Sequence, residues 1–105
     1  MKQNQKDAMS ESMLLAQDVV RFGGMQICYS LHVKEDFPTN QFEIRVSKDD
    51  ERMRATVGIC LDDAIEYYHS VVKGIVTPCT LEDVVKDFEY SRLKFQKNLY
   101  KRSII

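Results

Sequence analysis

The sequence predicts an α+β fold, a four-stranded antiparallel meander with two helices packed on one face. Three patterns support this fold class. Apolar and polar residues alternate along residues 12–60, a two-glycine turn falls inside that stretch, and apolar residues recur at three- and four-residue steps from residue 61 onward. A sheet with one apolar face needs a cover, and two amphipathic helices that follow it in the chain supply one.

Residues 12–22 suit either a helix or a strand, and the Gly23-Gly24 pair that follows decides between them. Two adjacent glycines tolerate positive φ at both positions of a two-residue hairpin turn. Apolar pairs then share one face and mostly polar pairs share the other, as a register-locked antiparallel hairpin requires. The predicted register pairs Phe22 with Met25, Val20 with Ile27, Asp18 with Tyr29, Ala16 with Leu31, and Leu14 with Val33.

Residues 34–41 contain a proline and an asparagine and are predicted to form a loop. Alternation over residues 42–47 predicts a third strand, a charged turn follows over residues 48–52, and alternation over residues 53–60 predicts a fourth strand. The acidic residues of the charged turn lack the spacing and the glycine of a calcium-binding loop. We therefore expect a solvated turn there and no metal site.

Two helices are predicted after the strands. Asp62 or Asp63 is expected to cap the first helix, and Gly74 lies where its C-terminus is expected. Pro78 lacks a backbone N–H, so this helix cannot continue through it. Thr80 then lies at the expected N-cap of the second helix.

The second helix carries an apolar stripe from Leu81 onward. We expect Phe88 to be buried where this helix crosses the sheet. We also expect the helix to continue past Glu89 to near Lys101, because the apolar stripe continues that far.

The pattern Val-Thr-Pro-x-x-Leu-x-Asp-Val-x-x-Asp-Phe over residues 76–88 resembles a family of small uncharacterised bacterial proteins, found mainly in anaerobic Gram-positive bacteria and described as a domain of unknown function. The resemblance covers roughly residues 14–89. Its most specific positions are Val76, Thr77, Pro78, Leu81, Asp83, Val84, Asp87 and Phe88. The resemblance implies a small α+β domain. It supplies no activity, so no catalytic residue is transferred from it.

A length of 105 residues predicts one domain. We place that domain at residues 12–89, after a mobile polar tail over residues 1–11 and before a basic amphipathic extension of the last helix over residues 90–105. The sequence has no secretory signal and no apolar run near the ~18 residues of a membrane span. We therefore expect a cytoplasmic protein without a membrane partner.

The sequence contains none of the common catalytic or nucleotide-binding motifs, so we expect no enzyme, no catalytic residue and no cofactor. His32 and His69 each lack a neighbouring carboxylate and nucleophile in the sequence. Cys28, Cys60 and Cys79 are odd in number and lack Cys-x-x-Cys spacing, which favours reduced thiols over disulfides or a zinc site.

Charge is unevenly distributed although the net charge is only −1. Residues 62–89 hold seven acids and two lysines, whereas residues 90–105 hold five basic residues and no acid. We predict a small non-enzymatic interaction module that forms a homodimer or docks a protein partner through its C-terminal helix. The alternative is a nucleic-acid-associated regulatory protein that uses the basic tail. The candidate interaction surface consists of Arg92, Lys94, Phe95, Leu99, Tyr100 and Lys101.

Overall fold

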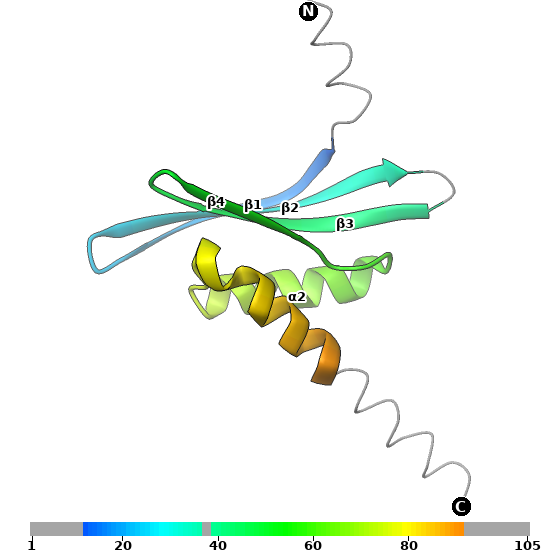
Figure 1. Ribbon diagram of the computed structural model, residues 1–105. Coiled ribbons are helices and arrows are strands. Elements are labelled where there is room, and N and C mark those ends of the chain that lie inside the picture. The colour runs from blue at the N-terminus through cyan, green and yellow to red at the C-terminus, as the bar shows by residue number, and fades with distance from the viewer. Residues whose placement is uncertain (1–11, 37–38, 92–105) are drawn as a thin grey trace, which may run out of the picture.

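The computed structural model describes residues 12–36 and 39–91, and within them it contains a four-stranded antiparallel sheet followed by helices (Figure 1). The strands lie in the order β1-β2-β3-β4, so the sheet is a meander. Their bounds are Met13–Phe22 for β1, Met25–Asp36 for β2, Thr39–Lys48 for β3 and Glu51–Thr56 for β4. The helix α2 spans Leu61–Lys73, the 3-10 turn η1 spans Pro78–Thr80, and a second helix occupies residues 81–91.

The predicted α+β fold with its four antiparallel strands is confirmed. The tail over residues 1–11 lies outside the described residues. So does the predicted course of the last helix beyond residue 91.

The first hairpin has the predicted register over most of its length. Phe22 lies opposite Met25, and the predicted pairs continue as far as Ala16 opposite Leu31. Both turn glycines have positive φ, 56° at Gly23 and 84° at Gly24, as the two-residue turn requires.

Beyond Ala16 the predicted register is wrong, because a bulge between Leu14 and Ala16 takes up one extra residue of β1. Leu14 lies opposite His32 instead of Val33, and Met13 takes the place opposite Val33. A one-residue slip moves a side chain to the other face of a sheet. The bulge therefore transfers Leu14 from the apolar face to the opposite one.

The predicted loop over residues 34–41 is also wrong, because β2 and β3 continue into it. Lys34 pairs with Gln41, and the ladder reaches Asp36 opposite Thr39. Backbone pairing needs no apolar side chain, so a polar stretch can extend a hairpin that its inner residues already align. Two positions of the expected loop, residues 37 and 38, lie outside the described part of the chain.

The fourth strand ends earlier than predicted. β4 stops at Thr56, although the amide of Val57 donates to the Phe42 carbonyl at 2.8 Å and that of Phe42 donates to the Gly58 carbonyl at 2.9 Å. Gly58 then adopts a φ of 91°, which turns the chain towards α2 and leaves Ile59 exposed.

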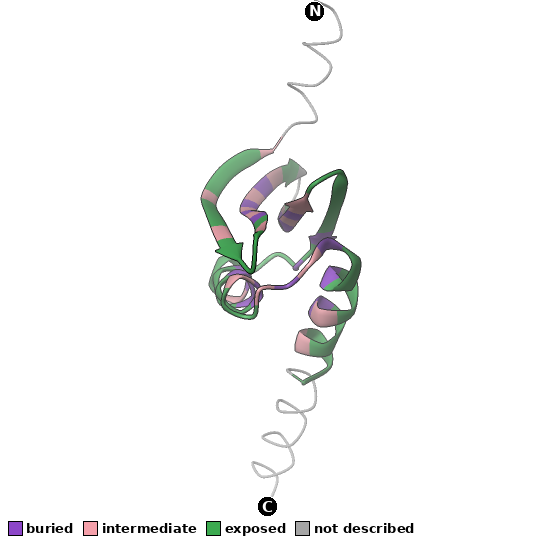
Figure 2. Ribbon diagram, turned by 90° about the vertical axis from the view of Figure 1, so that its left-hand side faces the viewer, coloured by how far each residue is buried: buried purple, intermediate pink, exposed green. Residues whose placement is uncertain are grey.

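The core lies between one face of the sheet and the helices (Figure 2). α2 packs against β2 and β3, and η1 packs against β4. The fully buried side chains alternate along the strands and recur along the helices, as the periodicity of the sequence predicts. The largest are Tyr29, Tyr68, Ile27, Leu31, Ile44, Leu81, Val46, Val57 and Val71.

Two buried tyrosines join the layers by hydrogen bonds. The Tyr29 hydroxyl donates to the Val76 carbonyl at 2.9 Å, just after α2. The Tyr68 hydroxyl donates to Asp18 Oδ2 at 2.6 Å, from α2 to β1. Burial raises the pKa of both tyrosines, and the bond to Asp18 raises that of Tyr68 further. Both hydroxyls therefore remain protonated donors near neutral pH.

The start of α2 differs from the prediction, whereas its end agrees with it. Cys60 is the N-cap of α2, and Asp62 and Asp63 lie in its first turn, where carboxylates favour the positive end of the helix dipole. At the other end Gly74 is the C-cap, as predicted, and the next residue, Ile75, takes the left-handed conformation with a φ of 53°. This αL ending satisfies carbonyls of the last turn through the amides of Ile75 and Val76.

The start of the second helix is also different. Thr80 does not cap it with a side-chain acceptor. Its hydroxyl donates to the Thr77 carbonyl at 3.2 Å, and η1 leads directly into the helix. Thr77 is the N-cap residue of η1, and Pro78 occupies its first position, where the missing N–H costs nothing.

Phe88 is half-buried rather than buried, which corrects the prediction. Its ring stacks on Tyr67 of α2, with the ring centroids 5.4 Å apart and an interplanar angle of 27°. Leu81 and Val85 are the residues of this helix that enter the core. Phe88 thus contacts the other helix, at the side of the helix layer.

Leu81→Ala should therefore destabilise the domain more than Phe88→Ala. Leu81 is fully buried, and such truncations cost ~2–5 kcal/mol through lost transfer energy and the remaining cavity. Chemical-denaturation curves measure both variants, with the exposed Tyr90→Ala as a control expected within about 0.5 kcal/mol of the parent chain. A larger loss for Phe88→Ala than for Leu81→Ala would contradict this assignment of the core.

Candidate functional site

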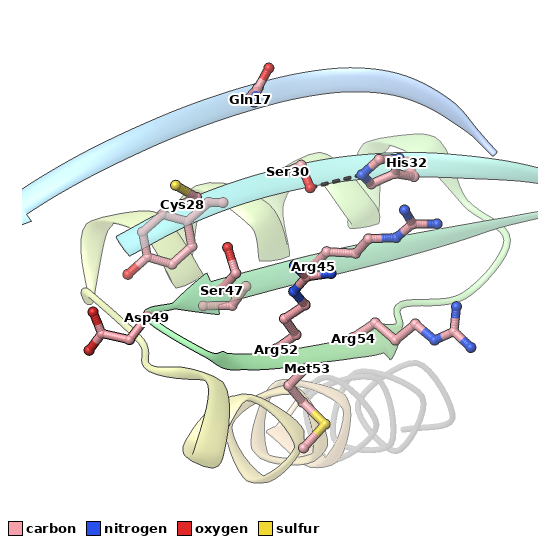
Figure 3. A pocket seen from close by; sticks show the side chains of 12 residues that line it. Gln17, Cys28, Ser30, His32, Arg45, Ser47, Asp49, Arg52, Met53 and Arg54 are labelled. Atoms are coloured by element: carbon pink, nitrogen blue, oxygen red, sulfur yellow. Dashed lines mark hydrogen bonds between the residues drawn. The ribbon is translucent and has the colours of Figure 1, made fainter. Parts of the chain in front are cut away.

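The face of the sheet that points away from the helices carries polar side chains in transverse rows (Figure 3). Residues directly opposite one another in an antiparallel sheet share a face, so the register defines each row. The central row contains Gln17, Ser30, Arg45 and Arg54. One neighbouring row contains Leu14, His32, Glu43 and Thr56, and the other contains Val19, Cys28, Ser47 and Arg52.

A shallow depression of about 770 Å³ lies over the last two strands and β2. Its polar lining includes Ser30, His32, Arg45, Ser47, Arg52 and Arg54. Figure 3 shows the arginines projecting from β3 and β4 over this surface, whereas Met53 points towards the helices. The depression is open to solvent, so a ligand there would remain partly hydrated.

His32 is held by hydrogen bonds at both ring nitrogens. Its Nε2 lies 2.8 Å from the Ser30 hydroxyl, and its Nδ1 lies 3.1 Å from the hydroxyl of Ser12. Arg45 Nη2 also donates to the Ser12 hydroxyl at 2.8 Å. These bonds connect β1, β2 and β3 across the open face.

Glu43 is the only charged side chain among the described residues that is buried. Its Oε1 accepts from Arg45 Nε at 2.7 Å, and its Oε2 lies 3.9 Å from Arg54 Nε. A buried carboxylate needs such partners, because an unpaired one would carry a large desolvation cost. Glu43 therefore ties β3 to β4 and neutralises part of the arginine charge.

Arg52 makes no ion pair with any residue that the structure describes. Its row neighbour Ser47 is neutral, and Arg45 lies directly opposite Arg54 in the next row. Like charges directly opposite each other in a sheet are destabilising. The depression and the adjoining Glu43 therefore bring together three guanidinium groups and one buried carboxylate.

The pKa of His32 is lowered below its usual value, first by burial and then by the positive charge of Arg45. Glu43 opposes this shift by favouring the protonated ring. The net shift favours the neutral imidazole. A neutral imidazole beside the Ser30 hydroxyl has the spacing of a base and a nucleophile, but its other nitrogen faces the Ser12 hydroxyl instead of an orienting carboxylate.

The second notable feature is the edge strand β1. Among the strands that the structure describes, only β2 lies beside it, and its exposed apolar residues lie on both faces of the sheet. Phe22, predicted to face the core, is 57% exposed, and Val19 is 49% exposed on the open face. The large exposed hydrophobic side chains of the strand are Met13, Leu14, Leu15, Val19 and Phe22.

The interaction surface predicted from the sequence lies outside the described residues. Its members are Arg92, Lys94, Phe95, Leu99, Tyr100 and Lys101. The arginine cluster was not predicted, although Arg45 and Arg54 alternate with apolar residues on either side of the charged turn and Arg52 is the last residue of that turn. Aligning the two strands across Asp49 and Asp50 would have placed all three on one face.

Cys28, Cys60 and Cys79 form no disulfide with one another in the structure; Cys28 is half-buried and the other two are exposed. Among residues 12–36 and 39–91, no group of three or more histidine, cysteine or acidic side chains is arranged to hold a metal ion. The helices within the same ranges are too short or too polar to cross a membrane.

These features define a small α+β domain with one covered sheet face, one open polar face and one apolar edge. Comparison with protein-family models, curated proteins and solved structures finds no match to this chain. The resemblance noted for residues 76–88 therefore stays a prediction.

Replacing Arg45 with glutamine should raise the pKa of His32. The substitution removes a nearby positive charge and leaves Glu43, which favours the protonated imidazole. NMR titration of the His32 ring measures this change, and in the parent protein its midpoint should lie below the usual value for histidine.

Arg21→Gln is the matched control for this titration. It removes the same charge from the same face, at a residue that bonds Gln26 near the hairpin turn. It should leave the pKa of His32 unchanged. An unchanged or lower pKa in Arg45→Gln would contradict the electrostatic account of this network.

Proposed function

We propose that the protein is a small non-enzymatic interaction module that self-associates by pairing β1 with β1 of a second copy. The observation that carries this proposal is the apolar, ten-residue edge of the sheet. An unpaired edge presents backbone N–H and C=O groups that a further strand can bond, and apolar side chains on such an edge favour burial there.

The opposite edge of the sheet has a different character. β4 is six residues long, and Glu51, Arg52 and Arg54 make half of it charged. Short and charged edges resist pairing with another chain. β1 has a single charged pair, Asp18 and Arg21, and Asp18 is already bonded to Tyr68. The two edges therefore differ in their suitability for strand pairing.

The sequence of β1 suits antiparallel pairing with itself. When the pairing is centred on Val19, this residue lies opposite its own copy on the open face, and Ala16 lies opposite Phe22 on the helix face. Every pair then joins residues of the same face. Counting from the hairpin turn, Gln17, Val19 and Arg21 are the residues whose N–H and C=O groups point away from β2.

α2 extends the apolar surface at this edge. Leu61, Ile65, Tyr68 and Val72 recur at helical spacing along one flank of α2. Tyr68 of that flank reaches β1 through Asp18, whereas Leu61 and Ile65 are exposed. If a two-fold axis perpendicular to the sheet relates the two copies, both helix layers lie on the same side of the combined sheet. The apolar flanks of the two α2 helices would then approach each other.

The nucleic-acid alternative and the docking surface after Ser91 concern residues 92–105, so both stay predictions. The edge-strand proposal does not depend on either. It places self-association on residues whose exposure and register are described.

Val19→Lys should weaken the dimer. Two lysines would face each other at the centre of the pairing, where like charges are unfavourable. Light scattering coupled to size exclusion should give a dimer mass for the parent chain at micromolar concentration, and sedimentation should show a dissociation constant at least about tenfold higher for the variant, equivalent to ~1.4 kcal/mol.

Ile59→Lys is the matched control, since Ile59 is another exposed apolar residue, beyond the end of β4. It should leave the dimer intact, and circular dichroism should show all three proteins folded. A monomeric parent chain at high micromolar concentration would overturn the proposal. A dimer that survives Val19→Lys would exclude β1 and direct attention to the C-terminal residues.

A further inference from the structure

We propose that the arginine cluster of the open face, Arg45, Arg52 and Arg54, binds the phosphate group of a small-molecule phosphate monoester. The depression over β2, β3 and β4 provides the space, and its volume is within the range of small-molecule sites. This binding site is distinct from the β1 edge, since all three arginines lie on the other half of the sheet.

The charge balance indicates the kind of ligand. Three guanidinium groups and the single carboxylate of Glu43 leave two uncompensated positive charges in the depression. Asp49 also lines it, but its side chain is mostly exposed and lies 3.9 Å from Lys48 Nζ. A phosphate monoester carries a charge of about −1.5 to −2 at pH 7, which matches this excess. A carboxylate or a phosphodiester would neutralise only half of it.

The arrangement of the arginines also suits a tetrahedral oxyanion. Arg45 and Arg54 lie directly opposite each other, and Arg52 is two residues along the same strand on the same face. Guanidinium groups bind phosphate oxygens through paired N–H donors, so neighbouring arginines can share one phosphate. Ser47, opposite Arg52, and Ser30, opposite Arg45, add hydroxyl donors beside them.

Glu43 leaves these arginines partly free. It uses one oxygen for Arg45 Nε and the other for the longer contact with Arg54. Arg45 is thereby fixed in place, whereas Arg52 has no ion-pair partner among the described residues. Positive side chains placed together without enough counter-charge repel one another, and a bound dianion would remove that repulsion.

Arg52→Gln provides the sharpest test, because it removes one guanidinium and breaks no ion pair that the structure describes. Isothermal titration with inorganic phosphate and with adenosine monophosphate as probes should show saturable binding to the parent chain. Each affinity should fall at least about tenfold in Arg52→Gln, which corresponds to the loss of one charge-assisted contact. Adenosine, which lacks the phosphate, should not bind.

Arg21→Gln is the matched control for net charge, since Arg21 lies on the same face near the hairpin turn and outside the depression. Its effect should stay below about twofold, in line with screening of distant surface charges. Arg52→Lys should fall between the parent and Arg52→Gln, because it keeps the charge and loses the forked donor. Thermal unfolding of each variant confirms that it is folded.

Two results would overturn the proposal. One is the absence of saturable binding at millimolar phosphate and adenosine monophosphate. The other is an equal loss in Arg21→Gln and Arg52→Gln, which would indicate general electrostatic attraction only. In the first case, a single-stranded oligonucleotide that still binds would assign the arginines to nucleic acid instead of a phosphate monoester. Retention of the dimer in Arg52→Gln separates the result from the self-association test.

Discussion

The hydrogen bonds of Tyr29 and Tyr68 fix how the helices lie on the sheet. Apolar burial brings the layers together without specifying direction, whereas a buried hydroxyl must find an acceptor. Tyr29 finds it in the Val76 carbonyl, which sets the point where the chain leaves α2. Tyr68 finds it in Asp18 of β1, which sets the rotation of α2 about its own axis. The stacked Tyr67 and Phe88 then place the second helix beside the first.

Because the helices cover one face of the sheet, the side chains of the other face are exposed to solvent. The other face must present side chains that water can solvate, and it carries arginine, serine, glutamine and histidine in rows. The acids of residues 62–89 lie on the helices, so the two sides of the domain carry opposite charge. This separation was visible in the sequence only as a contrast between the helices and the tail, because the basic half of the sheet is divided between two strands.

The predictable parts of the fold are those in which neighbouring residues in the sequence decide the outcome. The glycine pair and the alternation around it determine the register from Ala16 to Phe22. The run Met13-Leu14-Leu15-Ala16 has no alternation, so nothing local shows that a bulge changes which face each residue takes. The arginine cluster was missed for a related reason. It depends on pairing across Asp49 and Asp50, and pattern analysis treated each strand alone. The N-caps also differ from the prediction, since Cys60 precedes α2 and Thr77 precedes the 3-10 turn that leads into the second helix, and neither makes a side-chain capping bond.

The difference between the two edges of the sheet has a consequence for the size of any assembly. A sheet whose two edge strands can both pair with further strands can add copies without limit and grow into a fibre. Here β4 is short and half charged, so only β1 offers strand pairing. In the proposed dimer, pairing of β1 with its own copy would use that edge on both partners and leave a charged strand at each outer end. Growth would then stop at two subunits, and the charged outer edges would disfavour an amyloid-like stack.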